Sequence, residues 1–307
     1  MARTRRGTTG SPVRPLIPSP VDLHTHTTRS DGVLTPRELA EAAAAVGVRT
    51  LAITDHDTLA APRELAAEPG AIPARLELWP GVEINTVTDG SRVFWMGELH
   101  LLGLCVDPDD DAFEALLATQ RASRRERFER MVARLREVGL AVDDLAERLP
   151  VDERAALGRP TLGRLLVAKG LAESVEDAFD RIIGTDGPGY VPRSVVGPRE
   201  AIAAIRAAGG LPVLAHTADA ADREAVIREL RDIGLGGIEV HYRRYDRETV
   251  ASVASVARRL RLVPTGGSDY HGDRESYAEA HARLWVPTAD ADAVRAALGR
   301  QATGTPG

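Results

Sequence analysis

Histidine and carboxylate side chains that follow short apolar segments are the residues of this chain whose types and spacing suit chemistry. Seven of the eight histidines lie at or beside such segments, several of them next to Asp or Glu. The candidates are His24, His26, Asp31, His56, Glu83, His100, His216, Asp269 and His271. Imidazole and carboxylate ligands, with no cysteine among them, are typical of a divalent metal centre. Because the candidates extend over most of the chain, the fold itself must bring them together.

The positions of these residues favour one shared rim. Residues two apart along a strand project to the same side, so His24 and His26 can both present a ring nitrogen to one ion. His56, Glu83 and His216 also follow apolar segments with the composition of strands. If the sheet closes into a barrel of parallel strands, the C-terminal ends of the strands lie on one rim, and the ligands converge there.

The number of candidates exceeds the need of a single ion. A tetrahedral ion takes about four ligands, so nine are enough for two or three ions if a carboxylate bridges a pair. Glu83 is the best placed bridge. Bridged ions can hold two oxygens of one phosphate and a hydroxide between them. We therefore expect phosphoester hydrolysis by a metal-activated hydroxide, without a serine or cysteine nucleophile.

Composition narrows the class of protein. The 39 Lys and Arg residues against 45 Asp and Glu give a net charge of -6, which offers no general attraction for long nucleic acids or anionic membranes. No apolar stretch of about 18 residues occurs, and the basic residues 1–6 are not followed by the apolar segment of a secretory signal. The single cysteine, Cys105, suits a reducing compartment. We expect a cytoplasmic protein without a membrane partner or a stable nucleic-acid complex.

Short apolar runs alternate with helical patterns from Val21 onward, which predicts strands joined by crossover helices in an α/β fold. The first helix begins at Thr35, which forms a capping box with Glu38, and it ends at Gly47. Another helix is expected over 198–208. Strands are expected over residues 50–54, 76–85, 93–106, 211–215, 237–241, 262–266 and 283–286. A hairpin turn at residues 89–90 joins the second of these strands to the third.

The character of the sequence changes after residue 106, where strand-like runs stop for some ninety residues. We expect the following division of the chain: disordered tails at 1–18 and 301–307, a metal-binding barrel from 19–106 and 197–300, and an all-helical insert over 107–196 that caps the substrate.

The first helix of the insert, expected over about 111–138, is rich in arginine. We favour a solvated face as the interpretation of most of this charge. In the alternative, Arg124 or Arg125 acts with Arg159 and Arg193, and these arginines grip a second phosphate of the substrate through bidentate hydrogen bonds.

Taken together, these motifs resemble the PHP (polymerase and histidinol phosphatase) superfamily. The resemblance covers residues 21–290 and depends on 22–26 (DLHTH), 30–32 (SDG), 54–58 (TDHDT), 80–84 (PGVEI), 100–103 (HLLG), 215–216 (AH) and 267–272 (GSDYHG). Within the superfamily the chain is similar to a stand-alone bacterial branch whose members hydrolyse nucleoside 3',5'-bisphosphates or act as 5'-to-3' exoribonucleases on short RNAs. The helical insert and its motifs at 158–160 (GRP) and 189–192 (GYVP) support that branch.

The resemblance implies a distorted (β/α)7 barrel with three divalent ions, for which we expect Mn²⁺, with Fe²⁺ or Zn²⁺ as alternatives. Carried over motif by motif, the first ion is held by His24, His26, Glu83 and Asp269. The second is held by Glu83, His100 and His216, and the third by Asp31, His56 and His271. His241 is expected to contact substrate and not metal, because the ligand set is complete without it. The Ala215-His216-Thr217 segment departs from the branch, which more often has proline after this histidine.

We therefore expect a metal-dependent phosphoesterase that removes a terminal phosphate from nucleoside 3',5'-bisphosphates or acts at the 5' end of short oligoribonucleotides. His271, His216 or water would protonate the leaving oxygen. The alternatives are a histidinol-phosphate phosphatase and a proofreading or non-catalytic PHP module that serves a DNA polymerase. An amidohydrolase has little support, because the only lysine, Lys169, lies in the insert.

Overall fold

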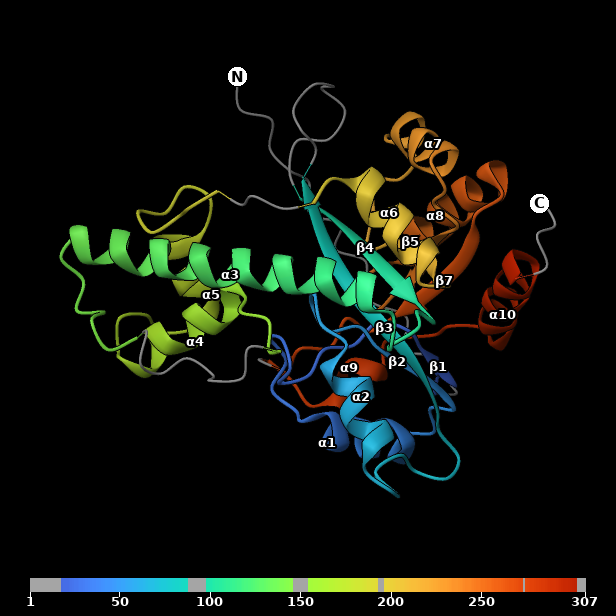
Figure 1. Cartoon of the computed structure of the whole chain (residues 1–307), viewed down its shortest axis with the longest axis horizontal. Helices are drawn as coiled ribbons and strands as arrows, with labels where there is room; N and C mark the ends of the chain where they lie inside the picture. The colour runs from blue at the N-terminus through green and yellow to red at the C-terminus, as the bar shows by residue number, and fades with distance from the viewer. Residues whose placement is uncertain (1–17, 88–97, 146–153, 193–195, 273, 303–307) are drawn as a thin grey trace.

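The computed structural model describes residues 18–87, 98–145, 154–192, 196–272 and 274–302. These residues form a seven-stranded sheet in the order β1 to β7, with helices packed around it (Figure 1). The strands are β1 (Val21–Asp22), β2 (Thr50–Ile53), β3 (Glu77–Val87), β4 (Glu98–Leu104), β5 (Leu211–Leu214), β6 (Gly237–Tyr242) and β7 (Val263–Gly267). The predicted α/β barrel is confirmed, since β1 and β7 also meet: Leu23 N donates to Gly266 O (3.0 Å), and Asp269 N donates to His24 O (2.7 Å).

One strand departs from a parallel barrel. β4 is antiparallel to both β3 and β5, whereas the other neighbours in the sheet are parallel. Only ten residues, 88–97, separate β3 from β4, whereas a parallel neighbour needs a crossover connection of about a dozen residues or more, so the chain returns antiparallel. The expected hairpin turn at 89–90 and the start of the expected strand at 93 lie outside the described residues.

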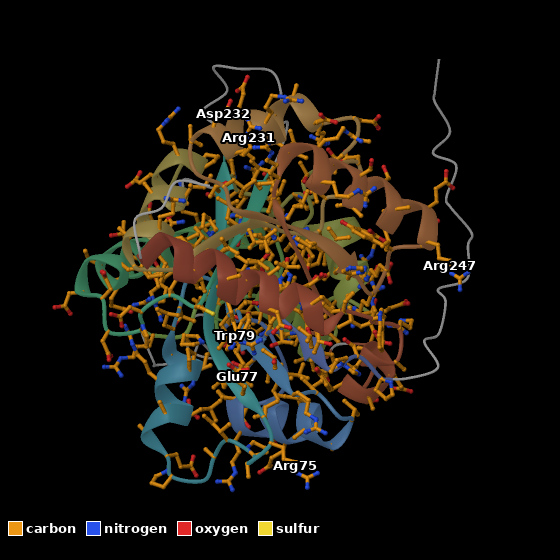
Figure 2. All side chains as sticks on the ribbon, turned by 90° about the vertical axis from the view of Figure 1, so that its right-hand side faces the viewer. Arg75, Glu77, Trp79, Arg231, Asp232 and Arg247 are labelled. Carbon is orange, nitrogen blue, oxygen red and sulfur yellow. The ribbon has the colours of Figure 1, made fainter. Side chains whose placement is uncertain are left out.

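Helix α10 (Thr288–Ala302) closes the end of the barrel opposite the metal-ligand candidates. Its buried Val294 packs with Val21, Leu211 and other inward-facing strand residues in one apolar cluster. Figure 2 shows Glu77 and Trp79 of β3 just below this helix, where Arg295 lies over the Trp79 ring, 4.9 Å from its centroid. The helix includes residues 301–302, the start of the expected tail; residues 303–307, like 1–17, lie outside the described part of the chain.

The strand predicted over 283–286 is wrong. The backbone N–H of Val286 donates to the hydroxyl of Ser19 (3.0 Å), and that hydroxyl donates back to Val286 O (3.4 Å). One side chain therefore satisfies the backbone that a neighbouring strand would otherwise pair. Leu284 and Val286 are still buried, which explains the strand-like composition.

The remaining helices of the barrel follow the expected alternation. They are α1 (Pro36–Ala45), α2 (Ala60–Ala67), α6 (Pro198–Ala207), α7 (Glu224–Asp232), α8 (Arg247–Leu260) and α9 (Tyr277–His281). The capping box between Thr35 and Glu38 is present at α1, as predicted. None of the helices in the described part of the chain has the length and apolar character that a membrane crossing requires.

Between β4 and α6 the described residues are helical, with α3 (Asp111–Glu137), α4 (Arg159–Ala168), α5 (Val175–Ala178) and the π-helix η2 (Phe179–Ile183). They share their own apolar cluster, which includes Phe128, Leu135 and Leu162. The segment before α4 contacts the barrel, because Ala156 N donates to Arg29 O (2.9 Å). The role of the helical insert as a substrate cap stays a prediction.

The seam between β1 and β7 offers a test of the closure. A Cβ added at Gly267 would lie 2.3 Å from His24 Cβ and 2.5 Å from His24 N. We expect Gly267→Ala to lower the free energy of unfolding by about 3 kcal/mol or more, since such overlap forces the two strands apart. Thermal unfolding measures the change. Gly299→Ala on α10, where a Cβ meets nothing within 4 Å, is the matched control, and equal melting temperatures for the two variants would contradict this account of the seam.

Candidate metal centre

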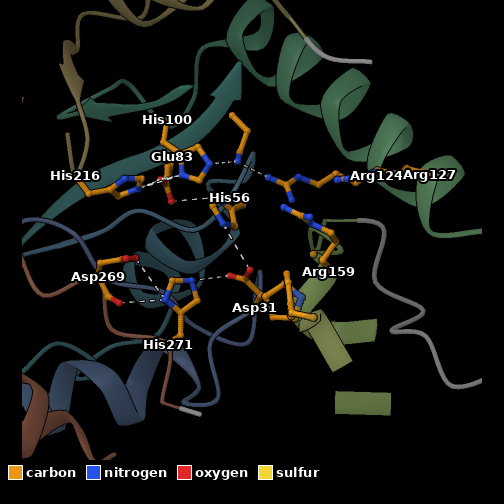
Figure 3. A pocket seen from close by; sticks show the side chains of 14 residues that line it. Asp31, His56, Glu83, His100, Arg124, Arg127, Arg159, His216, Asp269 and His271 are labelled. Atoms are coloured by element: carbon orange, nitrogen blue, oxygen red, sulfur yellow. Dashed lines mark hydrogen bonds and ion pairs between the residues drawn. The ribbon is translucent and has the colours of Figure 1, made fainter. Parts of the chain in front are cut away.

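All nine ligand candidates gather at one rim of the barrel (Figure 3). They form three groups whose ligand atoms lie within 4.8 Å of one another: His24, His26, Glu83 and Asp269; Glu83, His100 and His216; and His26, Asp31, His56 and His271. These are the three sets that the resemblance implied, with His26 as an additional member of the third. The structure therefore brings together every residue that the sequence proposed as a ligand.

Glu83 occupies the centre of the rim. It is 1% exposed, and its Oε2 lies 3.4 Å from His24 Nε2, 3.1 Å from His26 Nε2 and 3.2 Å from His56 Nδ1. The other oxygen, Oε1, lies 2.6 Å from His100 Nδ1 and 3.3 Å from His216 Nε2. Each oxygen of this carboxylate thus faces a different group, as a bridging ligand requires.

Asp31 and His271 hold the other side of the rim. Asp31 Oδ1 lies 3.3 Å from His271 Nε2, and Asp31 Oδ2 lies 3.6 Å from His56 Nε2. Asp55 supports this loop, because it accepts hydrogen bonds from the Thr27 backbone (2.7 Å) and from the Ser30 hydroxyl (2.5 Å). The loop is therefore fixed independently of any bound ligand.

The residues fit divalent cations on two grounds. His24 Nε2, His26 Nε2 and His56 Nδ1 are buried without a hydrogen-bond partner among the described residues, although a buried polar atom normally has one. Ligand atoms bound at roughly 2.1 Å to one tetrahedral ion lie about 3.4 Å apart, and the separations of 3.1 to 3.4 Å around Glu83 Oε2 agree with that value. These nitrogens are placed as metal ligands and not as hydrogen-bond donors to Glu83.

His100 reaches the rim from the antiparallel strand. Its partner in the ladder is Asn85, two residues beyond Glu83 on β3. The side-chain amide of Asn85 donates to His100 Nε2 (2.5 Å) and directs the other ring nitrogen at Glu83. Because β4 runs in the opposite direction, a histidine near its beginning lies beside the ends of the parallel strands.

Two of the ligand candidates have a left-handed backbone. The φ angle is 32° at His216 and 49° at Asp269. Such conformations cost about 1–3 kcal/mol for a non-glycine residue and gather at functional sites. They turn the chain sharply after β5 and β7, so that the side chains aim at the rim instead of continuing the strand.

Glu239 on β6 is a functional residue that the sequence analysis missed. It is fully buried; its Oε1 lies 3.1 Å from His24 Nδ1, and its Oε2 accepts from the backbone N–H of His216 (2.7 Å). One carboxylate therefore orients two ligand candidates, an arrangement common around metal sites. Tyr242, also missed, donates from its hydroxyl to Asp269 Oδ2 (3.0 Å).

Electrostatics couple the carboxylates to the imidazoles. Burial alone would raise the pKa of Glu83, but the surrounding imidazoles, His56 first, hold it well below its usual value. Burial lowers the pKa of His56 itself, and the charge of Arg124 acts in the same direction. Burial would also lower the pKa of His26, yet the neighbouring carboxylates of Asp269 and Glu83 raise it to about 10. The rim thus carries ionised carboxylates that suit cations.

The arginines of α3 divide into two sets. Arg121, Arg124 and Arg127 are buried at 6 to 8% exposure, which corrects the solvated-face interpretation for these three; Arg130 is exposed, as expected. Arg124 bonds Asp57 Oδ2 (2.5 Å) and Asn85 Oδ1 (2.8 Å). Spacing of three residues places the buried set on one side of the helix, toward the rim.

A cavity of about 210 Å³ opens beside the ligand candidates, and we call it the arginine-side cavity; its distinctive lining residues are Arg124, Arg127, Arg159 and Phe179. In Figure 3 these three arginines project from the insert toward the ligand candidates. Arg159 lies over the ring of Phe179, 5.3 Å from its centroid, and makes no hydrogen bond or ion pair with other described residues. A Cβ at the adjacent Gly158 would meet Asp31 Oδ2 at 2.8 Å, so glycine allows this segment to approach the rim closely.

Two of the other expected substrate contacts, Arg125 and His241, do not line this cavity. Arg125 is half-buried but is not among the residues that line this cavity, and Arg193 lies outside the described residues. His241 faces Asp290 on α10, with Nε2 3.2 Å from Oδ2, which corrects its assignment to the rim. A bulge between Glu239 and His241 breaks the alternation of β6, so Glu239 and Tyr242 point inward and His241 does not.

Comparison with known proteins agrees with this geometry. A family model of the PHP domain matches residues 22–139. The chain is also 33% identical, over 271 residues, to the 5'-3' exoribonuclease Rnm of Escherichia coli, an alignment that covers 87% of this chain and 89% of that protein. The chain belongs to the PHP family.

Other PHP relatives differ in their named substrates. The chain is 33% identical over 260 residues to a 3',5'-nucleoside bisphosphate phosphatase of Chromobacterium violaceum, covering 83% of this chain and 88% of the relative. It is 33% identical over 264 residues to a phosphoribosyl 1,2-cyclic phosphate 1,2-diphosphodiesterase of Eggerthella lenta, covering 82% and 94%. A solved structure from Bifidobacterium adolescentis, described as a metal-dependent phosphoesterase, superposes with a TM-score of 0.78 at 31% identity and covers 92% of this chain and 97% of that one. This PHP protein is therefore a metal-dependent phosphoesterase.

Glu239 provides a test of how the metal centre is positioned. We expect Glu239→Gln to weaken binding of the most tightly held divalent ion by roughly 10- to 100-fold, because the amide cannot accept both hydrogen bonds that fix His24 and His216. Isothermal titration calorimetry of the metal-depleted protein with Mn²⁺ measures the change in affinity. Glu248→Gln, an exposed glutamate at the start of α8, is the control. Unchanged Mn²⁺ affinity in the Glu239 variant would rule out a positioning role.

Proposed function

We propose that this PHP phosphoesterase removes the 3'-phosphate of nucleoside 3',5'-bisphosphates and cleaves very short oligoribonucleotides from the 5' end. The observation that carries the proposal is the position of Arg159, a guanidinium without an ionic partner among the described residues, in a cavity that opens onto the ligand candidates. A substrate with one phosphate at the rim and a second in the arginine-side cavity would use both features. The names of the exoribonuclease and bisphosphate phosphatase relatives support the same substrate class.

The proposed ion content is three divalent cations, one for each ligand group. The donors are imidazole nitrogen and carboxylate oxygen without thiolate, which suits Mn²⁺, with Fe²⁺ or Zn²⁺ as alternatives. Bound cations would neutralise the phosphoryl oxygens and acidify a water molecule that attacks phosphorus. The chain's own part is to orient His24 and His216 through Glu239, to fix the Asp31 loop through Asp55, and to exclude bulk water from His24, His26 and Glu83.

The arginines have separable roles in this proposal. Arg159 is free to form a bidentate pair with the second phosphate. Arg124 is held by Asp57 and Asn85, so it contributes positive charge and fixes Asn85 behind His100. A histidinol phosphate has a single phosphate and would leave Arg159 without an anion, which makes the histidinol-phosphate alternative the weaker candidate.

Substrate comparison tests the proposed function directly. The purified protein, with its metal content measured and Mn²⁺ added, is assayed on adenosine 3',5'-bisphosphate, a 5'-phosphorylated diadenylate and histidinol phosphate. We expect kcat/KM to be higher for the bisphosphate and the diadenylate than for histidinol phosphate, because only substrates with a second phosphate engage the arginine-side cavity. Removal of metal by a chelator should abolish the activity, and Mn²⁺ should restore it. Equal and slow hydrolysis of the three substrates would refute the assignment.

Arg159→Ala tests the clamp. A hydrogen-bonded contact with a charged group is worth roughly 1.5–3 kcal/mol, so we expect KM for adenosine 3',5'-bisphosphate to rise about 10- to 100-fold, with adenosine 3'-monophosphate affected far less. Arg125→Ala, on α3 but outside the cavity, is the matched control. If the Arg159 variant loses both substrates equally, Arg159 supports the metal centre and does not bind the second phosphate.

A further inference from the structure

A second cavity adjoins the ligand candidates and has no role in the account given so far. It measures about 520 Å³, and we call it the tyrosine-side cavity; its lining residues are His100, His216, Ala218, Tyr242, Arg244, Tyr245, Asp246, Thr249 and Asp269. His100, His216 and Asp269 line both cavities. The ligand candidates therefore form a partition with a space on either side, and a group bound at the rim can extend in two directions.

The two sides differ in chemistry. The distinctive residues of the arginine-side cavity are three arginines, whereas the tyrosine-side cavity has the single Arg244 and two tyrosines. Its aromatic wall begins at the metal centre: the ring of Tyr242 lies 6.0 Å from that of His216 and 5.1 Å from that of Tyr245. Proteins bind single-stranded nucleic acid by stacking bases on aromatic rings beside a basic residue.

The sizes of the cavities also differ. Ligand pockets for small organic molecules usually have volumes of roughly 300–1,000 Å³. The tyrosine-side cavity, at about 520 Å³, is within that range and is larger than the arginine-side cavity, at about 210 Å³. Arg244 at its mouth is exposed and makes no hydrogen bond or ion pair with the rest of the described chain, so it can take a further phosphate.

We propose that the tyrosine-side cavity binds the nucleotide that follows the scissile phosphate of a short RNA, so that Tyr242, Tyr245 and Arg244 decide how well an oligoribonucleotide is hydrolysed relative to the bisphosphate. This inference rests on the proposed function and extends it. A 3',5'-bisphosphate has no substituent beyond its scissile phosphorus and leaves this cavity empty. A 5'-phosphorylated dinucleotide places its second nucleoside against Tyr242 and Tyr245, and a trinucleotide directs its next phosphate to Arg244.

The reaction balances with water as the only co-reactant. Water adds to the scissile phosphorus, and the bond from phosphorus to the 3' oxygen of the first nucleotide breaks. That oxygen takes a proton, and the first nucleotide leaves as a 5'-monophosphate. The rest of the RNA retains the phosphate at its new 5' end and can enter a further cycle.

The test distinguishes a role in the tyrosine-side cavity from a role in the hydrolysis at the rim, which both substrates share. Tyr245→Leu removes the aromatic ring but keeps apolar volume, and Tyr245→Phe keeps the ring. Each variant is assayed on adenosine 3',5'-bisphosphate and on the 5'-phosphorylated diadenylate. Since stacking of one base contributes enough for a change of about tenfold or more, we expect Tyr245→Leu to lower kcat/KM for the diadenylate by about tenfold and to leave the bisphosphate within about twofold. Tyr245→Phe should match the wild type on both substrates.

Arg244→Ala is a second, exposed variant with little bearing on folding. It should lower kcat/KM for a 5'-phosphorylated triadenylate by about fivefold or more, the loss expected for one phosphate contact, without change for the bisphosphate. Arg247→Ala is its matched control, because Arg247 lies at the periphery (Figure 2) and lines a different cavity.

Two results would overturn the inference while leaving the proposed function in place. They are a Tyr245→Leu variant that loses both substrates equally, and variants that lose neither. A wild-type protein that hydrolyses the bisphosphate but not the diadenylate would defeat both the inference and the oligoribonucleotide part of the proposed function. A wild-type protein inactive on every nucleotide would defeat the proposed function and this inference with it.

Discussion

The rim of ligand candidates is organised around the buried carboxylate of Glu83. Five imidazoles approach its two oxygens within 3.4 Å, and three of the ring nitrogens have no hydrogen-bond partner among the described residues. An ionised group in such a place is unfavourable unless opposite charge compensates it. Divalent cations supply that charge and bind the nitrogen lone pairs at the same time. The arrangement of the rim is therefore typical of a metal centre and not of a protein core.

The rest of the barrel holds the ligand candidates close together, although their carboxylates repel one another. β1 and β7 meet across Gly267, which places the segment of His24 and His26 beside that of Asp269. The left-handed conformations of His216 and Asp269 turn the chain out of β5 and β7 toward the rim, and their strain is offset by the apolar packing beneath. Because α10 and Trp79 close the opposite end of the barrel, substrate can reach the ligand candidates only at the rim.

Residues with a local signature could be predicted from the sequence. His24, His56 and Asp269 follow apolar strands, and Glu83 lies on β3 just beyond the part that pairs with β2; the parallel barrel places such positions together. His100 does not obey that rule; the resemblance supplied it, and the antiparallel β4 explains it. Tyr242 was missed and His241 was misplaced for a single reason: the bulge in β6 changes which side chains face inward, and an alternating pattern gives no sign of a bulge. Glu239 was missed although alternation places it on the side that was assigned to His241. The burial of Arg124 and Arg127 could not be predicted either, because it results from tertiary contacts that the helical periodicity does not indicate.

The contacts between insert and rim link substrate choice to the metal centre. Arg164 donates to the backbone oxygen of Asp31 (2.7 Å), Gly158 packs against the Asp31 carboxylate, and Arg159 follows at once on the cavity side. Any shift of this segment would therefore move both the arginine available to a second phosphate and the loop that carries a ligand candidate. The loop after β6 is tied to the metal centre as well, because Tyr242 donates to Asp269 Oδ2 (3.0 Å) and Arg243 donates to Asp269 O (3.1 Å). Each cavity is therefore coupled to one ligand candidate, Asp31 on the arginine side and Asp269 on the tyrosine side, so a shift of either wall would disturb metal binding and substrate choice together.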